Sequence, residues 1–293
     1  MKREKIHVVM AADEAYWKGL EVAKNSMIAS CSEPERLEFH LFEDKLGLTD
    51  RIRREFGMYK GSPMAFLRLY LGEFLPDVDW VVYSDVDTLW YRDIIELWSL
   101  RDESKTIQWV QDVPSTREET YRWQHSLNEH FDKELYGCSG VMLFNLRRFR
   151  EERGLEKAIE FTRKHGLFKY VDQDILNALY HGKCRFLPEC WDVMIPTPEN
   201  VSGGCVLHLV GGGRCFTAPY RGRIVQYKYW ESVAKGVPFS RPWALPFYMR
   251  DWMIRILCPF ASVFMRDRIR RNLAWRYFLR RFSAVGVENR GRE

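Results

Sequence analysis

The 293-residue chain is predicted to be an α/β protein whose last part is a basic, aromatic helical tail. Three observations lead to this prediction. Short apolar runs rich in β-branched and aromatic residues alternate with longer segments of helical periodicity, polar or glycine-rich residues follow most of the runs, and arginine is concentrated near the end of the chain. We therefore expect one α/β domain over residues 1–235 and a separate basic segment over residues 236–293.

Six strands are predicted where apolar residues run together or alternate with polar ones. The clearest is Trp-Val-Val-Tyr at residues 80–83, since β-branched and aromatic residues are enriched in buried strands. In chain order the predicted strands cover residues 6–11, 37–42, 80–83, 106–111, 140–146 and 205–210.

Helices are predicted between these strands. In the first of them Leu20, Ala23 and Met27 recur at helical spacing, and Pro63 suits the first turn of a later one. The predicted helices cover residues 14–30, 50–56, 63–74, 93–98, 149–165 and 173–180. Residues 113–135 are polar and irregular, so we expect a loop that passes over a site.

Charge is unevenly distributed along the chain. Residues 250–293 contain eleven arginines and four acidic residues, a local charge of +7 within a total of +5, which leaves −2 for the remainder. Apolar residues between 260 and 282 follow helical spacing with arginines beside them, a pattern typical of a helix that lies on an anionic membrane. Packing against the domain and oligomer formation are alternatives, and nothing elsewhere in the chain supports a nucleic-acid partner.

The cysteines indicate a reducing compartment. Their number is odd, seven, and their spacing is not paired, so reduced thiols in a cytoplasm are expected. We find no signal-peptide pattern and no apolar segment long enough to span a bilayer. The expected location is therefore cytoplasmic, attached peripherally to the inner face of the cytoplasmic membrane. A zinc site is an alternative use of Cys184, Cys190, Cys205, His208 and Cys215, but no Cys-x-x-Cys pair is present to begin it.

Two carboxylates follow the strand predicted at 80–83. Asp85 and Asp87 are alternate residues of an extended segment, so their side chains can point the same way and bind one ion. Hard carboxylate oxygens suit Mn²⁺ or Mg²⁺, and such an ion can bridge phosphates. The alternative is an acidic turn in contact with solvent.

Further polar residues stand at the ends of other predicted elements, and with the Asp-x-Asp pair they form a recognisable series. In order and spacing the chain resembles the family 8 glycosyltransferases of the GT-A fold, a Rossmann-like fold, among them bacterial lipopolysaccharide galactosyl- and glucosyltransferases and glycogenin. The resemblance extends over roughly residues 5–216. The matching segments are Ala11-Ala12-Asp13 with Tyr16, residues 66–69 with Leu75-Pro76, residues 83–87, residues 139–146, residues 172–177, and His208 with Gly211.

The resemblance implies a role for each matching residue. Asp85, Asp87 and His208 would bind the metal. Gln173, beneath the anomeric carbon, and Asp172 would form the catalytic pair. The donor-binding residues would be Asp13, Tyr16, Arg68, Asp112, Gly211 and Arg214.

Each role has a structural alternative. Asp13 and Asp172 could cap helices, and His208 could be a core histidine. Arg68 could face solvent, but the apolar residues around it indicate a buried surface, where a guanidinium needs a carboxylate partner. The chain also departs from the family, with Cys138 where Asn is usual, Arg214 in place of Lys, and Cys215-Phe216 in place of Pro-Trp.

The activity implied by the resemblance is a retaining, metal-dependent transfer of galactose or glucose from a UDP-sugar to a membrane-associated glycolipid or oligosaccharide. Lipopolysaccharide core is the expected acceptor. Two alternatives stay open: a glycogenin-like or protein-directed glucosyltransferase, and a non-catalytic protein that binds sugar nucleotides.

Overall fold

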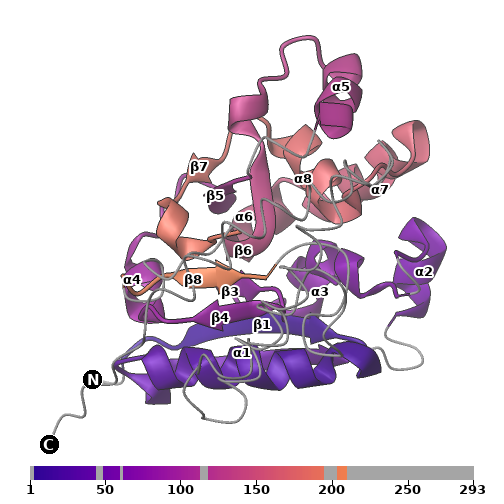
Figure 1. Cartoon of the computed structure of the whole chain (residues 1–293). Coiled ribbons are helices and arrows are strands. Elements are labelled where there is room, and N and C mark those ends of the chain that lie inside the picture. The colour runs from indigo at the N-terminus through magenta and orange to yellow at the C-terminus, as the bar shows by residue number, and fades with distance from the viewer. Residues whose placement is uncertain (1–2, 44–48, 60–61, 113–117, 195–202, 210–293) are drawn as a thin grey trace, which may run out of the picture. The chain divides into compact units, whose positions relative to one another are not determined.

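A computed structural model describes residues 3–43, 49–59, 62–112, 118–194 and 203–209. Six strands form one mixed sheet in the order β2-β1-β3-β6-β5-β7, and two short strands, β4 and β8, form a separate antiparallel pair (Figure 1). The strands are β1 (Ile6–Ala12), β2 (Leu37–Glu43), β3 (Trp80–Ser84), β4 (Thr88–Trp90), β5 (Ile107–Gln111), β6 (Gly137–Asn145), β7 (Arg185–Phe186) and β8 (Val206–His208).

Strand direction changes within the large sheet. β2, β1 and β3 are mutually parallel, whereas β6 runs antiparallel to both β3 and β5. The carboxyl end of β3 therefore lies beside the amino-terminal part of β6, with Ser84 paired to Val141. All nine residues of β6 are buried, which explains its uninterrupted apolar run at residues 141–144.

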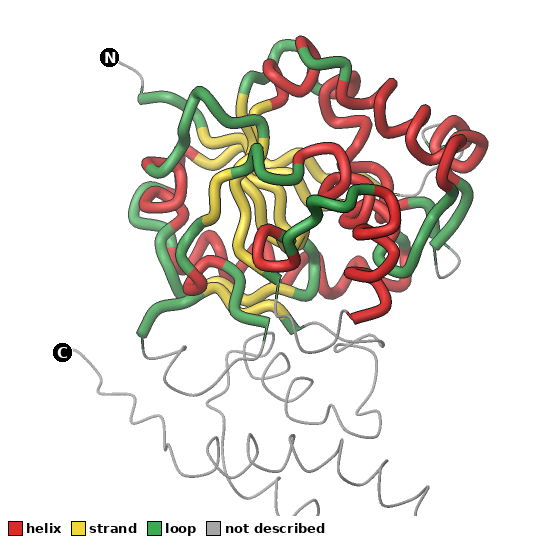
Figure 2. Tube along the Cα trace, turned by 90° about the horizontal axis from the view of Figure 1, so that it is seen from above, coloured by secondary structure: helices red, strands yellow, loops and turns green. Residues whose placement is uncertain are grey.

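Helices cover both faces of this sheet. The α-helices are α1 (Trp17–Ser30), α2 (Asp50–Phe56), α3 (Leu71–Phe74), α4 (Ile94–Ser99), α5 (Glu118–Leu127), α6 (Leu146–Glu151), α7 (Gly154–His165) and α8 (Val171–Tyr180). Short 3₁₀ helices are η1 (Glu14–Tyr16), η2 (Pro34–Arg36), η3 (Met64–Tyr70), η5 (Lys133–Leu135) and η6 (Glu189–Trp191). Figure 2 shows the strands between helices on two sides.

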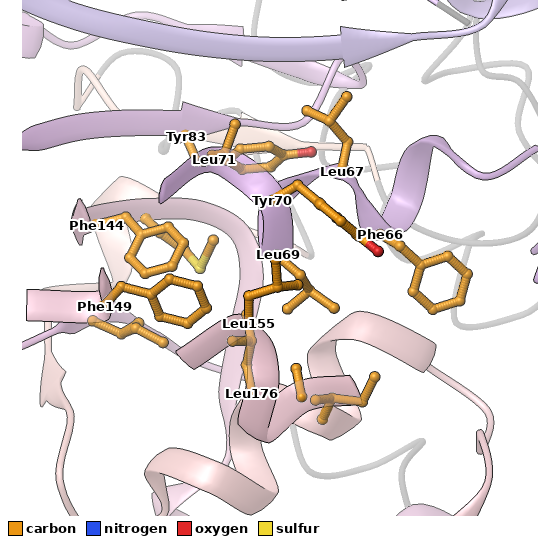
Figure 3. Close-up of a cluster of buried hydrophobic side chains, with 14 of the residues drawn as sticks. Phe66, Leu67, Leu69, Tyr70, Leu71, Tyr83, Phe144, Phe149, Leu155 and Leu176 are labelled. Carbon is orange, nitrogen blue, oxygen red and sulfur yellow. The ribbon is translucent and has the colours of Figure 1, made fainter. Parts of the chain in front are cut away.

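The sheet separates two hydrophobic cores. One core joins alternate residues of β1 and β3 to α1 and α4, and α1 lies alongside β1 in Figure 1. The other joins the opposite face to η3 and to α6, α7 and α8. Figure 3 shows its centre, where the Phe144 and Phe149 rings meet edge to face at 4.9 Å, near Leu155 and Leu176. Buried apolar side chains occupy both faces of the sheet. The side chains available for a polar site are therefore those at the strand ends.

The predicted α/β fold is confirmed, with three corrections. Residues 113–135 are more than a loop, because α5 and η5 lie within them. The helix predicted over 149–165 is two helices, α6 and α7, separated by Arg153 in the left-handed conformation at φ 54°. Strands β4 and β7, of three and two residues, were not predicted. The basic segment 236–293 lies outside the described residues.

Among the helices that the structure describes, none combines the length and apolar character needed to cross a bilayer.

Candidate functional site

The two carboxylates lie in the turn that joins β3 to β4. The turn is tied to β6, because the backbone N–H of Asp85 donates to the carbonyl of Gly140 at 2.7 Å. Residues of β4 pair with β8, so Thr88 stands opposite His208. This pairing brings a histidine more than one hundred residues away in sequence next to the acidic turn.

His208 faces both carboxylates. Its Nε2 lies 3.3 Å from an Asp87 oxygen and 3.7 Å from an Asp85 oxygen. Its Nδ1 lies 2.8 Å from Oδ1 of Asp192, a fully buried carboxylate. Burial opposes a charge on the imidazole, but Asp192 and Asp87 together hold the pKa of His208 well above its ordinary value. In the metal-free protein, a positively charged His208 imidazole offsets the negative charge of these neighbouring carboxylates.

Gly140 makes room for this histidine. A Cβ added at Gly140 would overlap the imidazole ring of His208. The absence of a side chain on β6 therefore allows the ring to lie directly over the strand and present Nε2 to the acidic turn. Cys138, two residues earlier, also approaches the ring, with its Sγ 3.9 Å from Nδ1.

Arg68, on η3, joins the acidic turn to α8. Its guanidinium is 4% exposed and contacts one Asp85 oxygen and one Asp172 oxygen, each at 2.9 Å. It also donates to the carbonyl of Ser139 and lies over the Tyr83 ring, 4.2 Å from the centroid. Burial would lower the pKa of Arg68, but the two carboxylates raise it above its ordinary value. The guanidinium thus stays charged and fixes the orientation of both acids.

The carboxyl of Asp172 has an unusual pKa. Burial raises it from 3.8 to about 7, against the opposing effect of Arg68. Val171, just before it, has φ 33°, a conformation that β-branched residues rarely adopt. Such strain is found where the surrounding structure holds a functional residue in place.

Gln173 is held at both ends of its amide. Oε1 accepts from the Ser139 backbone N–H at 3.0 Å, and Nε2 donates to an oxygen of buried Asp112 at 2.7 Å. One turn further along α8, Asn177 exchanges two hydrogen bonds with the backbone of Gly137, at 2.7 and 2.8 Å. Helix α8 is therefore fixed to β6 by side-chain amides, and the Gln173 side chain is fixed with it.

The remaining predicted residues are placed as follows. Asp13 follows β1 and caps η1, since its side chain accepts from the backbone N–H of Tyr16 at 3.1 Å. Tyr16 is partly buried against the α1 core. Gly211 and Arg214 lie outside the described residues.

The donor set fits a small divalent cation. Ligands bound at about 2.0–2.1 Å around an octahedral ion lie roughly 3 Å apart, near the separations from His208 Nε2 to the two carboxylates. The side chains of Asp85 and Asp87 are 27% and 30% exposed, so an ion and its water ligands can reach them. Carboxylate oxygens with one imidazole nitrogen are compatible with Mn²⁺, and imidazole is a poorer partner for Mg²⁺. Within the described ranges, no potential metal cluster contains Cys184, Cys190 or Cys205, and Cys215 lies outside them.

Sequence reasoning missed three contributors. Asp192 is a single acid in an irregular stretch and carried no signal. Ser139, noted only as the first residue of the matching segment 139–146, supplies its backbone N–H to Gln173 and its hydroxyl to Asp172. Tyr83 donates to Asp85 at 3.1 Å, and its place two residues before Asp85, in the matching segment 83–87, was the available hint.

The chain is similar to known proteins in sequence and in fold. The family model described as glycosyl transferase family 8 matches residues 58–206, just over half of the chain. The lipopolysaccharide 1,2-glucosyltransferase of Escherichia coli K12 is 28% identical over 166 residues, covering 55% of this chain and 46% of that enzyme. General stress protein A of Bacillus subtilis 168 is 22% identical over 277 residues, covering 77% and 94%. The chain spans less than two thirds of the length of several curated relatives that it matches.

A solved structure shows the same fold. The galactosyltransferase LgtC, in complex with donor and acceptor sugar analogs, superposes with a TM-score of 0.62 at 20% identity, covering 82% of this chain and 99% of LgtC.

Proposed function

The chain belongs to glycosyl transferase family 8, and from that premise we propose that it transfers galactose or glucose, with retention, from a UDP-sugar to a membrane-associated glycolipid. The observation that carries the proposal is the convergence of Asp85, Asp87 and His208 at the point where Arg68 joins them to α8. In this proposal, the residues that would bind a cation and a diphosphate lie next to a rigid polar surface that would bind the sugar.

Asp85, Asp87 and His208 would hold the metal, Mn²⁺ or Mg²⁺. When bound, the ion supplies positive charge that stabilises the diphosphate as it leaves. Asp192 accepts a hydrogen bond from Nδ1 of His208, which leaves Nε2 as the coordinating nitrogen. When a metal displaces the Nε2 proton, the imidazole would keep its proton on Nδ1, which is the tautomer that a metal ligand requires.

The polar surface beside these ligands would bind the hexose. Asp112 and Asp172 would accept hydrogen bonds from sugar hydroxyls, and the contact with Arg68 supports this role by holding the Asp172 carboxylate in position. Gln173 is clamped through both ends of its amide, so its oxygen can stabilise an oxocarbenium-like carbon without reorganising. The acceptor hydroxyl would attack from the face that UDP vacates. Arg214 would contact the diphosphate through two N–H groups of its charged guanidinium.

The acceptor is inferred from two features. One is the similarity to a lipopolysaccharide glucosyltransferase, and the other is the basic, aromatic segment 236–293, which would lie on the inner face of an anionic cytoplasmic membrane. Deletion of residues 250–293 is expected to abolish sedimentation with anionic vesicles. Retained sedimentation would remove the membrane part of the proposal while leaving the transfer reaction untouched.

The reaction is tested by release of UDP. Purified protein with Mn²⁺ is incubated with a panel of UDP-sugars, with and without truncated lipopolysaccharide core, and UDP is measured. We expect one hexose donor to be hydrolysed slowly and the core oligosaccharide to increase the rate. Asp87→Asn should abolish release, and Glu129→Gln, at an exposed carboxylate, should not. Asp87 is preferred to Asp85 because Asp85 also pairs with Arg68.

The role of Gln173 needs a separate variant. Gln173→Ala is expected to lower kcat with little change in the affinity for UDP, because the amide faces the sugar and not the nucleotide in this proposal. A wild-type kcat would refute the assignment. Binding of UDP-sugar with no turnover of any donor would instead indicate a non-catalytic binding protein, and glucose attached to a tyrosine of the chain would indicate a glycogenin-like enzyme.

A further inference from the structure

Two histidines and a glutamate meet at the start of the sheet, far from the candidate active site. We propose that His7, Glu38 and His40 form a second metal site, one that binds a transition-metal ion such as Zn²⁺. His7 is on β1, and Glu38 and His40 are on the neighbouring edge strand β2. The candidate-site residue Asp13 follows the carboxyl end of β1. It is six residues from His7, which corresponds to about 20 Å along an extended strand.

The strand register brings the three side chains to one face. His7 pairs with Glu38, and Val9 with His40, so all three residues lie on the same side of the sheet because side chains alternate along a strand. Nδ1 of His7 is 2.9 Å from Nε2 of His40 and 3.8 Å from Oε1 of Glu38. The potential ligand atoms of the three residues all lie within 4.8 Å of one another.

These separations fit a four-coordinate ion. Ligand atoms at about 2.0–2.1 Å around a tetrahedral Zn²⁺ are roughly 3.3 Å apart, between the two measured distances. Small side-chain rotations would lengthen the distance between the His7 and His40 nitrogens and shorten the distance from His7 to the Glu38 carboxylate. Two imidazoles and one carboxylate leave the fourth position for water, and they favour Zn²⁺, Ni²⁺ or Cu²⁺ over hard ions.

The local environment supports an accessible site with an uncharged His40. Burial and the neighbouring His7 lower the pKa of His40, so its ring is uncharged at neutral pH, the form that binds metals. The side chains of His7 and Glu38 are 24% and 48% exposed, which gives an ion a route from solvent. In the metal-free protein the two rings share one N–H, and an ion would take the place of that proton.

Such an ion would fasten the edge strand to its neighbour. β2 is the outermost strand on its side of the sheet and pairs only with β1 among the described strands. Ligands from both strands would add a cross-link where the backbone ladder has no second partner. The simpler alternative is a histidine–histidine hydrogen bond with no metal, and the experiment below separates the two.

The test uses the full chain carrying Asp85→Asn and Asp87→Asn, so that the acidic pair of the candidate active site cannot bind the added ion. Binding of Co²⁺, a spectroscopic substitute for Zn²⁺, is followed by its d–d absorption, and absence of thiolate charge transfer excludes cysteine ligands. We expect one ion per chain in competition with Zn²⁺. Adding His7→Gln or His40→Gln should weaken binding by more than about 100-fold, beyond the effect usual for residues behind a ligand.

His130→Gln is the matched control, because His130 also lies near a glutamate, 3.7 Å from Glu129, but is exposed and belongs to none of the potential metal clusters in the described part of the chain. Binding unchanged by His7→Gln and His40→Gln, or no binding at all, would overturn the proposal. Circular dichroism of each variant establishes that it is folded. Because the parent variant lacks the acidic pair, the outcome does not depend on the proposed transferase activity.

Discussion

Replacing Asp172 with asparagine is expected to remove a pH-dependent part of the stability of the metal-free protein. Asp172 is 4% exposed, and burial raises the pKa of its carboxyl from 3.8 to about 7 even with Arg68 beside it. Asparagine keeps the size and shape of the side chain but cannot ionise. The variant therefore isolates the titration from the packing.

The magnitude follows from linkage between protonation and folding. With a carboxyl pKa of about 7 in the folded state and ~3.9 in the unfolded state, the folded protein holds more protons between these values. The free energy of unfolding of the wild type consequently falls as pH rises through this window, by about 4 kcal/mol in total at ~1.36 kcal/mol per pH unit. Between pH 5 and pH 8 the fall is about 2–3 kcal/mol.

Urea unfolding followed by tryptophan fluorescence, in the presence of a chelator at pH 5, 6, 7 and 8, gives the required comparison. The difference between wild type and Asp172→Asn should shift by about 2–3 kcal/mol in favour of the variant from pH 5 to pH 8. Glu160→Gln, at an exposed position of α7, is the control and should give a constant difference. A constant difference for Asp172→Asn would show that burial does not control this carboxyl, and the reasoning would fail.

Three further predictions concern the residues that position the site. Asp192→Asn should weaken Mn²⁺ binding by about 10–100-fold, measured by the electron paramagnetic resonance of free Mn²⁺, because the tautomer of His208 is no longer fixed; unchanged affinity would contradict this role. Gly140→Ala should also weaken Mn²⁺ binding, by at least about 10-fold, since its Cβ would displace the imidazole, and wild-type binding would show that the ring does not need this space. Asn177→Ala should lower the free energy of unfolding by about 2–3 kcal/mol in urea, because the buried N–H and C=O of Gly137 lose their partners; a loss under about 0.5 kcal/mol would contradict this.

Local sequence signals predicted most of the elements. The helix at 50–56 has the predicted bounds, and the strand at 80–83 is extended by one residue. These segments have a clear periodicity or a clear β-branched composition, which depends on neighbouring residues only. Helix α5 was missed because most of it is polar, and only Thr120, Tyr121 and Gln124 are buried in it. The break before α7 depends on one backbone conformation, at Arg153, that no composition signal marks.

The candidate site was predicted less evenly. Asp85 and Asp87 stood out from their spacing alone, but His208 joined them only through the resemblance to a family. Arg68 was expected to be buried, because apolar residues flank it, and to need a carboxylate; the structure provides two, Asp85 and Asp172. Asp192 could not be predicted, since its role depends entirely on which residue lies opposite it.

Three features could be read from the sequence alone: the alternation of strands and helices, the acidic pair, and the need to compensate a buried guanidinium. These are consequences of short-range periodicity and of the cost of burying charge. The folded structure was needed to show that β6 runs antiparallel, that β4 pairs with β8, and that Gly140 leaves space for His208. Those facts depend on contacts between segments distant in the chain, whose energies come from packing and pairing that no local pattern records.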